Sequence, residues 1–326
     1  MSEKKNAVTL KEWANIAIAK HTRKIFKYEA DVLKDKNPED LHQMRVGMRR
    51  LRSAIAGFAV AIDLPKTVNE KNLAKIGRSL GKLRDLDVLL AALTDDYRPL
   101  LPAKEQKSLN KVIKALNKQR KRELKQVRQT LNSKLYLHFQ QDLQNWLERP
   151  QYRAIGDLSI YTVLPDLLLP QIAQLLLHPG WLVGVELKAG TARFLEMPNP
   201  NAVEQLKREE PILHDLRKLA KKNRYSLELF SQFYDDTYQH YLKQIEQIQE
   251  VLGQIQDCYV LRKILEKSLK SAIAKKMPEL AALLSKTRYE KWQEWQTLQK
   301  QFLEDRTRNE FRQTIQQPIR SSTTNH

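Results

Sequence analysis

The stretch HQMRVGMRRLR at residues 42–52 occurs a second time, in altered form, as HDLRKLAKKNR at residues 214–224, an offset of 172 residues. The alignment continues without a gap to Phe58 in the first copy and Phe230 in the second. A second block keeps the same offset, with LGKLRDLDVL at residues 80–89 aligned on LGQIQDCYVL at residues 252–261. Two separated blocks in one register predict two structurally equivalent halves, each a helical bundle.

Each copy of the first block predicts a helix with a basic face. At about 100° per residue, four side chains of the first copy fall within an arc of roughly 80°: His42, Arg45, Arg49 and Arg52. The matching face of the second copy carries His214, Arg217, Lys221 and Arg224. An apolar stripe of the kind that a bundle helix buries borders each basic face. Positive charges stacked one turn apart repel each other, so an anion bound there would relieve the repulsion. Arginine forks are well suited to phosphate oxygens.

The second block predicts how these faces are supported. Gly81 and Gly253 lie inside helical patterns, where glycine costs about 1 kcal/mol relative to alanine, so we expect a neighbouring helix to approach closely there. Asp85 and Asp257 are expected to orient basic side chains or to cap a helix turn. The first half adds positive charge at Lys82 and Arg84, where the second has Gln254 and Gln256, so the two faces should differ in strength. Arg78, one turn before Lys82, is a further added cation of the first half.

These blocks resemble the CHAD family, the conserved histidine α-helical domain, over roughly residues 8–310. The resemblance implies an all-α fold in which two pseudo-symmetric helical bundles present basic helices to a central groove or pore. It also implies non-catalytic binding of inorganic polyphosphate, without cofactor or metal. Together with the added cations, the matching positions give the predicted binding residues: His42, Arg45, Arg49, Arg50, Arg52, Arg78, Lys82, Arg84, His214, Arg217, Lys218, Lys221, Lys222 and Arg224.

The chain departs from the family pattern in two respects. The second half lacks the Arg-Asp-Leu-Asp sequence of the first and has Gln256-Asp257-Cys258-Tyr259 instead, so we expect this segment to participate unequally in the two halves. Some relatives carry an N-terminal triphosphate tunnel domain, whereas this sequence starts directly on the bundle pattern, and no triphosphatase activity is implied. Whether His42 and His214 contact the ligand or tie neighbouring helices together stays open.

Composition supports a polyanionic partner. Lys and Arg number 57 against 38 Asp and Glu, a formal net charge of +19, which favours polyphosphate, nucleic acid or an acidic surface. The single cysteine, Cys258, fits a cytoplasmic protein and is expected to pack as a small apolar residue. The most apolar stretch, residues 161–177, is interrupted by Pro165, Asp166 and Pro170, so we predict a soluble protein without membrane insertion. Location at cytoplasmic polyphosphate granules follows from the expected ligand.

Helical periodicity covers most of the chain, which has only nine glycines and no convincing alternating strand. We expect an extension at residues 1–7, a CHAD-like domain at 8–310 with halves at about 8–150 and 160–310, and a disordered tail at 311–326. Gly180–Pro200 is the expected linker, and Asn37 and Asn201 are expected to cap the helices that carry His42 and His214. The predicted helices span about 10–33, 38–62, 69–93, 103–130, 134–147, 164–177, 202–230, 235–255, 257–274 and 278–308.

Three other chemistries fit parts of the sequence. Nucleic-acid binding would use similar electrostatics, although no nucleic-acid motif or obvious aromatic stacking platform is evident, and Trp292 and Trp295 are expected to be a packing pair. A di-metal site could use Glu39-x-x-His42, but the surrounding face is cationic. Asp85 and Asp87 could hold Mg²⁺ in a phosphohydrolase, but there is no glycine-rich phosphate loop, and an ion pair within the bundle is the favoured interpretation.

Overall fold

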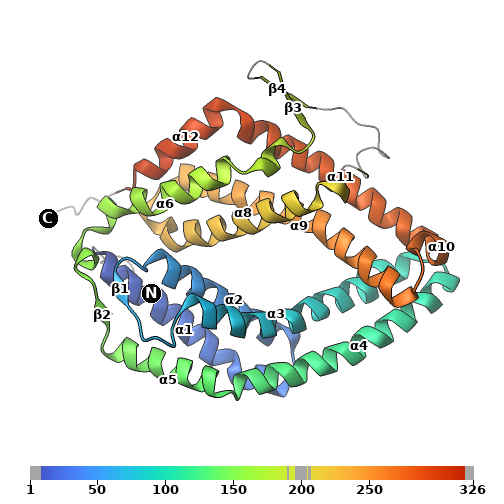
Figure 1. The fold of residues 1–326 in the computed structure, drawn as a ribbon, viewed down its shortest axis with the longest axis horizontal. Helices are drawn as coiled ribbons and strands as arrows, with labels where there is room; N and C mark the ends of the chain where they lie inside the picture. The colour runs from blue at the N-terminus through green and yellow to red at the C-terminus, as the bar shows by residue number, and fades with distance from the viewer. Residues whose placement is uncertain (1–8, 189–190, 195–203, 205–206, 320–326) are drawn as a thin grey trace. The chain divides into compact units, whose positions relative to one another are not determined.

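The computed structural model describes residues 9–188, 191–194, 204 and 207–319, and helices dominate this part of the chain (Figure 1). The fold is all-α, as predicted. The chain divides into two compact units, the first formed by Met1–Leu100 with Leu109–Val163 and the second by Leu101–Ser108 with Leu164–His326. Each unit holds one copy of both repeated blocks. The central groove or pore expected between the halves stays a prediction.

The first unit is built around a pair of packed helices that carry its repeated blocks. Helix α2 packs against both α1 and α3, and its apolar stripe is buried, with Met44 and Leu51 fully enclosed. The start of α2 is set as predicted, because the Asn37 side chain accepts a hydrogen bond from the Glu39 amide at 2.9 Å and Pro38 occupies the first turn. The helices of this unit are α1 (Leu10–Lys34), α2 (Pro38–Gly57), α3 (Glu70–Ala91), α4 (Ala103–Leu131), whose first residues belong to the second unit, and α5 (Lys134–Glu148).

The second unit repeats the central pair and adds an aromatic core. Helix α9 packs against both α8 and α11. The buried indole of Trp181 stacks on Trp295 and on Phe302, with ring centroids 5.1 and 5.3 Å apart. Trp292 is also buried, which agrees with the packing role expected for the tryptophans. The helices of this unit are α6 (Ile160–Leu176), which starts in the first unit, α8 (Glu210–Phe230), α9 (Asp236–Leu269), α10 (Ile273–Lys276), α11 (Pro278–Leu303) and α12 (Asp305–Gln316).

Two small antiparallel sheets were not predicted. Strand β1 (Ile62–Asp63) pairs with β2 (Gln151–Tyr152), and β3 (Val185–Lys188) pairs with β4 (Thr191–Phe194). The predicted last turn of α2 is therefore absent, because the helix ends at Gly57, residues 58–61 form a turn, and Ile62 begins β1. The residues paired with Ile62 and Asp63 lie 90 and 88 positions away, so local periodicity could not reveal the strand. The hairpin of β3 and β4 lies within the expected linker at 180–200, part of which falls outside the described residues.

Several helix boundaries differ from those predicted. Helix α9 is continuous where a break was expected at residue 256, because its buried face continues through Ile255, Cys258 and Leu261. Helix α8 begins at Glu210, with Pro211 in its first turn. Asn201, expected to cap this helix, lies outside the described residues.

The prediction of a disordered tail from residue 311 is wrong for residues 311–316. These residues belong to α12, and both Phe311 and Ile315 are fully buried. The Phe311 ring stacks on Tyr241 of α9, with ring centroids 4.5 Å apart. Burial of these two apolar side chains holds the helix in place despite its polar sequence. Residues 320–326 of the expected tail, and residues 1–7 of the expected extension, lie outside the described part of the chain.

Helix α6 is continuous although it contains Pro165 and Pro170. The expectation that these prolines interrupt the apolar stretch is therefore wrong. The segment Ile160–Leu182 is long and apolar enough to cross a membrane, a test that the core helix of a soluble protein also passes. Within α6, Leu164, Leu168 and Ile172 are buried.

Candidate anion-binding faces

An arginine of α2 lies directly over a glycine of α3 in the first unit. A Cβ added at Gly81 would sit 3.4 Å from Nε and Nη2 of Arg45, so the guanidinium occupies the space that a side chain would fill. Nη2 of Arg45 lies 3.3 Å from Oδ1 of Asp85, one turn further along α3. The glycine therefore lets the arginine pack against the neighbouring helix, and the aspartate orients it.

The same contact recurs in the second unit. A Cβ added at Gly253 of α9 would sit 3.3 Å from Nε and Nη2 of Arg217 on α8. Nη2 of Arg217 lies 3.9 Å from Oδ1 of Asp257. The prediction that the two glycines permit close helix approach is confirmed, and each aspartate forms an ion pair with the arginine beside it.

The two contacts also match in their exposure. The arginine side chains are 25% exposed for Arg45 and 26% for Arg217, and the aspartates are 71% exposed for Asp85 and 69% for Asp257. Each guanidinium thus packs on the glycine of the neighbouring helix and lies beside a solvent-exposed carboxylate. Because each guanidinium is partly exposed, an external anion can approach it without burying either charge. We name each arginine–glycine–aspartate set an arginine clamp.

A histidine lies one turn before each clamp arginine. Burial lowers the pKa of His42, and the nearby cations Arg84, Arg49 and Arg45 lower it further. Burial also lowers the pKa of His214, followed by the charges of Lys218 and Arg217. Both imidazoles are therefore mainly neutral at neutral pH. The Nδ1 atom of His214 is buried and makes no hydrogen bond, so no protein group in the described part of the chain fixes that nitrogen.

The other predicted residues of the first unit do not all share one face. Arg49 and Arg84 are close enough to His42 to affect its pKa. Arg50 instead lies toward α1, where its charge lowers the pKa of Lys24 after the larger effect of burial. Arg50, a predicted binding residue, thus lies off the basic face of α2, because residue 50 lies about 100° around the helix from Arg49.

Three further cations of this unit are exposed. Arg52 is exposed and lies 3.7 Å from a carboxylate oxygen of Glu70. Arg78 and Lys82 are exposed on α3. Arg78 and Lys82 lie within one turn of Gly81 along α3, so they can contribute mobile positive charge near the clamp.

The second unit uses part of its predicted set for internal ion pairs. Lys218 binds Asp215 at 2.8 Å, and the same carboxylate lies 3.4 Å from Nε2 of His178. Arg224 is only 15% exposed and pairs with Glu228 at 3.0 Å and Glu246 at 2.9 Å.

The carboxylates around Arg224 neutralise it, and it is poorly placed to bind an external anion. Lys221 is partly exposed and Lys222 is exposed on the same helix. With glutamines at 254 and 256, the second face has fewer available cations than the first.

Asp85 and Asp87 do not converge on a common ligand. Asp85 lies at the clamp, whereas the buried carboxylate of Asp87 accepts a hydrogen bond from Nε of Arg120 at 2.6 Å. The Arg120 guanidinium also donates to both oxygens of Asp35, at 2.8 and 2.7 Å. This placement agrees with ion pairs within the bundle. Among the described residues, no three His, Cys, Asp or Glu side chains gather as a metal-binding group.

Sequence reasoning missed the network around Arg120. Arg120 lies on the inner side of α4, near the turn containing Leu116, and its partners are 33 and 85 residues away. The available sequence signal is that Arg120 lies one turn after Leu116, on the apolar side of a lysine-rich helix. In the second unit, the buried Cys258 behaves as expected, since burial raises the pKa of its thiol to about 11.

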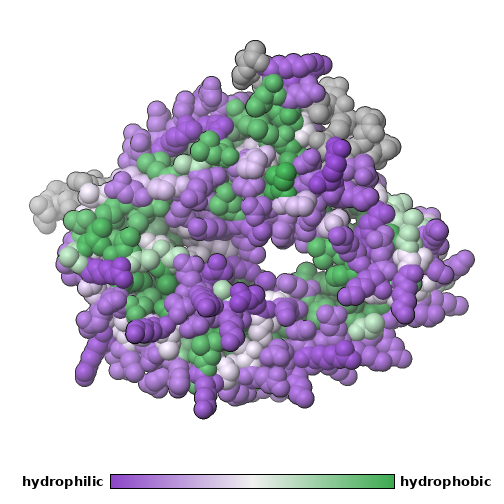
Figure 2. Space-filling model, in the orientation of Figure 1, coloured by the Kyte–Doolittle hydropathy of each residue, from purple (hydrophilic) through white to green (hydrophobic). Residues whose placement is uncertain are grey.

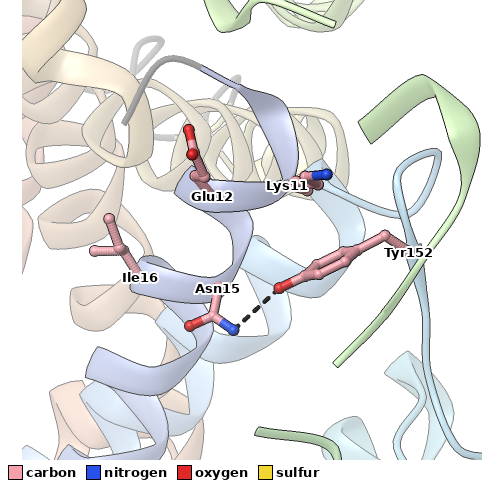
Figure 3. A pocket seen from close by; sticks show the side chains of 5 residues that line it. All are labelled: Lys11, Glu12, Asn15, Ile16 and Tyr152. Carbon is pink, nitrogen blue, oxygen red and sulfur yellow. Dashed lines mark hydrogen bonds between the residues drawn. The ribbon is translucent and has the colours of Figure 1, made fainter. Parts of the chain in front are cut away.

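A pocket of about 310 Å³ lies on the first unit but contains none of the predicted binding residues (Figure 3). The start of α1 and strand β2 line it. The Asn15 amide donates a hydrogen bond to the Tyr152 hydroxyl at 3.0 Å, and Lys11 is bound to Asp157. Since its polar groups are paired with one another, the pocket offers little for an anion to bind.

The fold and the two matching clamps define an all-α protein built from two helical units of related sequence. The model of the CHAD domain matches residues 16–266, and the chain belongs to the CHAD domain family. The crystal structure of the CHAD domain from the plant Ricinus communis has a TM-score of 0.59 and 23% identity, covering 96% of this chain and 93% of that one. PptA from Streptomyces chartreusis has a TM-score of 0.56 and 14% identity, covering 95% and 100%. At these identities the likeness concerns the fold. No curated protein matches the sequence.

Proposed function

We propose that this protein binds inorganic polyphosphate through the basic faces of its two units and does not catalyse a reaction on it. The observation that carries the proposal is the arginine clamp, which occurs in both units with nearly the same exposure and geometry. Each clamp holds a guanidinium in a fixed position beside further cations. Membership of the CHAD family supports polyphosphate as the anion, since binding of that polymer is what the family resemblance implies.

Affinity in this proposal comes from the sum of many charge-assisted hydrogen bonds. The clamp arginines contribute fixed donors, and exposed cations such as Arg52 and Lys82 contribute charge that can follow a flexible polymer. Because Arg224 is neutralised by two glutamates, the proposal assigns it a structural role. Its place in the set of binding residues is therefore withdrawn.

The decisive experiment is a competition titration at fixed ionic strength with long-chain polyphosphate, single-stranded RNA and duplex DNA. Polyphosphate is expected to bind most tightly. Fixed ionic strength is essential because counterion release makes every polyanion affinity depend on salt. Equal or tighter binding of either nucleic acid would replace the preferred ligand by the alternative one.

The faces themselves are tested by charge reversal. We expect Arg45→Glu combined with Arg217→Glu to weaken polyphosphate binding by at least about a hundredfold, because each clamp loses its donor and gains a repelling charge. The matched control is Arg98→Glu with Arg312→Glu, which changes net charge equally at exposed arginines elsewhere. Circular dichroism should show unchanged helix content in both variants. Equal loss in the control would mean that net charge, and not the clamp, sets the affinity.

The non-catalytic part of the proposal has its own assay. Orthophosphate release from polyphosphate is measured with Mg²⁺ and with Mn²⁺, and no turnover is expected. Robust turnover that Asp85→Asn abolishes would make the protein a metal-dependent phosphohydrolase.

For the cell, the proposal places the protein on polyphosphate granules in the cytoplasm. A fluorescent fusion should collect at these deposits, and the Arg45→Glu, Arg217→Glu variant should not.

A further inference from the structure

Helix α4 carries a row of lysines that the basic faces do not use. Five of them follow each other at intervals of three and four residues, and all five are exposed: Lys111, Lys114, Lys118, Lys121 and Lys125. We call them the α4 lysine row. At 1.5 Å per residue the row extends about 21 Å along the helix. Figure 1 shows α4 as an uninterrupted helix over this length.

The row lies opposite the side by which α4 packs. Leu109, Leu116 and Val127 are buried at 0–4% exposure, and Lys118 is nine residues from both Leu109 and Val127, about half a turn around the helix. The row therefore faces away from the packed side of α4. The surface along α4 at the lower right of Figure 2 is mainly hydrophilic, in agreement with this placement.

Almost no acidic charge offsets the row. Between Lys107 and Gln129, Glu123 is the only acidic residue. It lies on the inner half of the helix and is partly buried. The other glutamate of α4, Glu105, is buried and accepts hydrogen bonds from the amides of Glu279 and Leu280 at the start of α11. The lysines thus repel one another at one-turn spacing, a cost that a bound polyanion would remove.

The chemistry of the row favours one kind of occupant. No aromatic or large apolar side chain lies between the lysines on the outer face, so this face lacks the anchors of a membrane-surface helix. It also lacks the aromatic residues on which nucleic-acid bases stack. Lysine supplies mobile point charges without a geometric preference. These properties suit an extended, flexible chain of phosphates.

We propose that the α4 lysine row is an additional polyphosphate-binding surface, of lower selectivity than the clamp faces, on which a second stretch of polymer binds. The inference rests on the proposed function. It gives the protein a way to hold two polymer segments at once, and hence to join long polyphosphate chains to one another. Binding at the row should depend steeply on salt, because it consists of point charges on a solvent-exposed surface.

The test starts from the full-length Arg45→Glu, Arg217→Glu variant, in which the row remains. We expect weak residual binding of long-chain polyphosphate. Replacing the five row lysines by glutamine should weaken it at least a further tenfold. We also expect the same five replacements in the otherwise unchanged protein to reduce the slope of log affinity against log salt for long chains, which reach the row. The reduction should be at most about 3.5, because each of the five charges contributes about 0.7. They should leave the affinity for short chains within about twofold and lower the turbidity formed with long chains.

The matched control removes five exposed lysines of the second unit: Lys243, Lys267, Lys275, Lys276 and Lys286. If the control lowers residual binding and turbidity as much as the row variant does, the row has no special role and the inference fails, while the proposed function stands. If the unchanged protein does not bind short-chain polyphosphate, the proposed function fails first. If RNA or anionic phosphatidylserine vesicles bind the row more tightly than polyphosphate, the assigned occupant is wrong.

Discussion

The two units agree at the surface and differ beneath it. Each unit sets an arginine over a glycine beside an aspartate, and the exposures of these side chains differ by no more than two percentage points. The first unit holds a second, largely enclosed arginine, Arg120, between Asp87 and Asp35. In the second unit Tyr259 occupies the position that aligns with Asp87, and the buried Arg288 lies 5.6 Å from its ring.

Within the part of the chain that the structure describes, the buried arginine of the second unit, Arg288, lacks the carboxylate partners that Arg120 has in the first. Nε and Nη2 of Arg288 make no hydrogen bond among the described residues, and burial lowers the pKa of this guanidinium. A buried cation without a carboxylate partner contributes little or nothing to stability. The clamp, which faces solvent, is thus kept in both units, while the interior arginine pairs with two carboxylates in one unit and lies beside an aromatic ring in the other.

Breaking the ion pairs of Arg120 should have the largest effect on stability. We expect Arg120→Met to lower the free energy of unfolding of the first unit by about 3 kcal/mol, because it leaves the carboxylate of Asp87 buried without its partner. Urea denaturation followed by circular dichroism measures the loss. Arg122→Met, at an exposed position on the same helix, is the control and should change stability little.

The pH dependence of this variant provides a second measurement. Burial already raises the pKa of Asp87, and the hydrogen bond from Arg120 opposes that rise. Without Arg120 the folded-state pKa rises further above the unfolded value, so the folded state binds more protons. The deficit of the variant should therefore shrink as pH falls through the raised pKa of Asp87. A deficit that stays constant with pH would mean that lost packing, not the buried charge, causes the instability.

Displacing the clamp arginines without changing their charge should have the next largest effect, this time on polyphosphate affinity. Gly81→Leu with Gly253→Leu places side chains where the guanidinium groups of Arg45 and Arg217 lie. We expect polyphosphate affinity to fall about tenfold, roughly the value of one charge-assisted hydrogen bond. Gly77→Leu is the control, because a Cβ there meets no atom within 4 Å. If all three substitutions leave affinity unchanged, the position of the arginines is unimportant and only their charge acts.

The limits of sequence reasoning follow from the range of the contacts. The clamp could be anticipated because Arg45, Gly81 and Asp85 are duplicated in one register, and a pattern that occurs twice at the same offset is more informative than a single copy. The Arg120 network joins α4 to α1 and α3 without a duplicated signal, so it was missed. Phe311 was assigned to a disordered tail because its neighbours are polar, although the Tyr241 ring of α9 buries it. Local sequence pattern thus predicts helices and the residues that share a helix face, whereas contacts between residues distant in sequence become visible only in the folded structure.

Removing the unpaired arginine should have a smaller effect and the opposite sign to Arg120→Met. We expect Arg288→Met to raise the free energy of unfolding of the second unit by about 1 kcal/mol, since an apolar side chain of similar length replaces a buried charge without hydrogen bonds at two of its nitrogens. The measurement is urea denaturation, with the exposed Lys286→Met as control. A loss as large as that of Arg120→Met would show that the tyrosine ring supports its arginine as well as two carboxylates do.

The histidines should give the smallest effect, and one shared by both units. Burial and neighbouring cations lower the pKa of His42 and His214 in the free protein. A bound phosphate offsets those cations, so the pKa of each imidazole is higher in the complex and binding takes up protons. Affinity should rise as pH falls through the pKa of the complex and level off below the pKa of the free protein, by about threefold in total. Titrations at fixed ionic strength across this range, compared with His42→Gln combined with His214→Gln, measure the change. The double variant should lose the pH dependence and keep the affinity seen at high pH. If the double variant keeps the pH dependence, protonation of the histidines is not coupled to ligand binding. Their role is then structural, and the clamp arginines bind the phosphate without them.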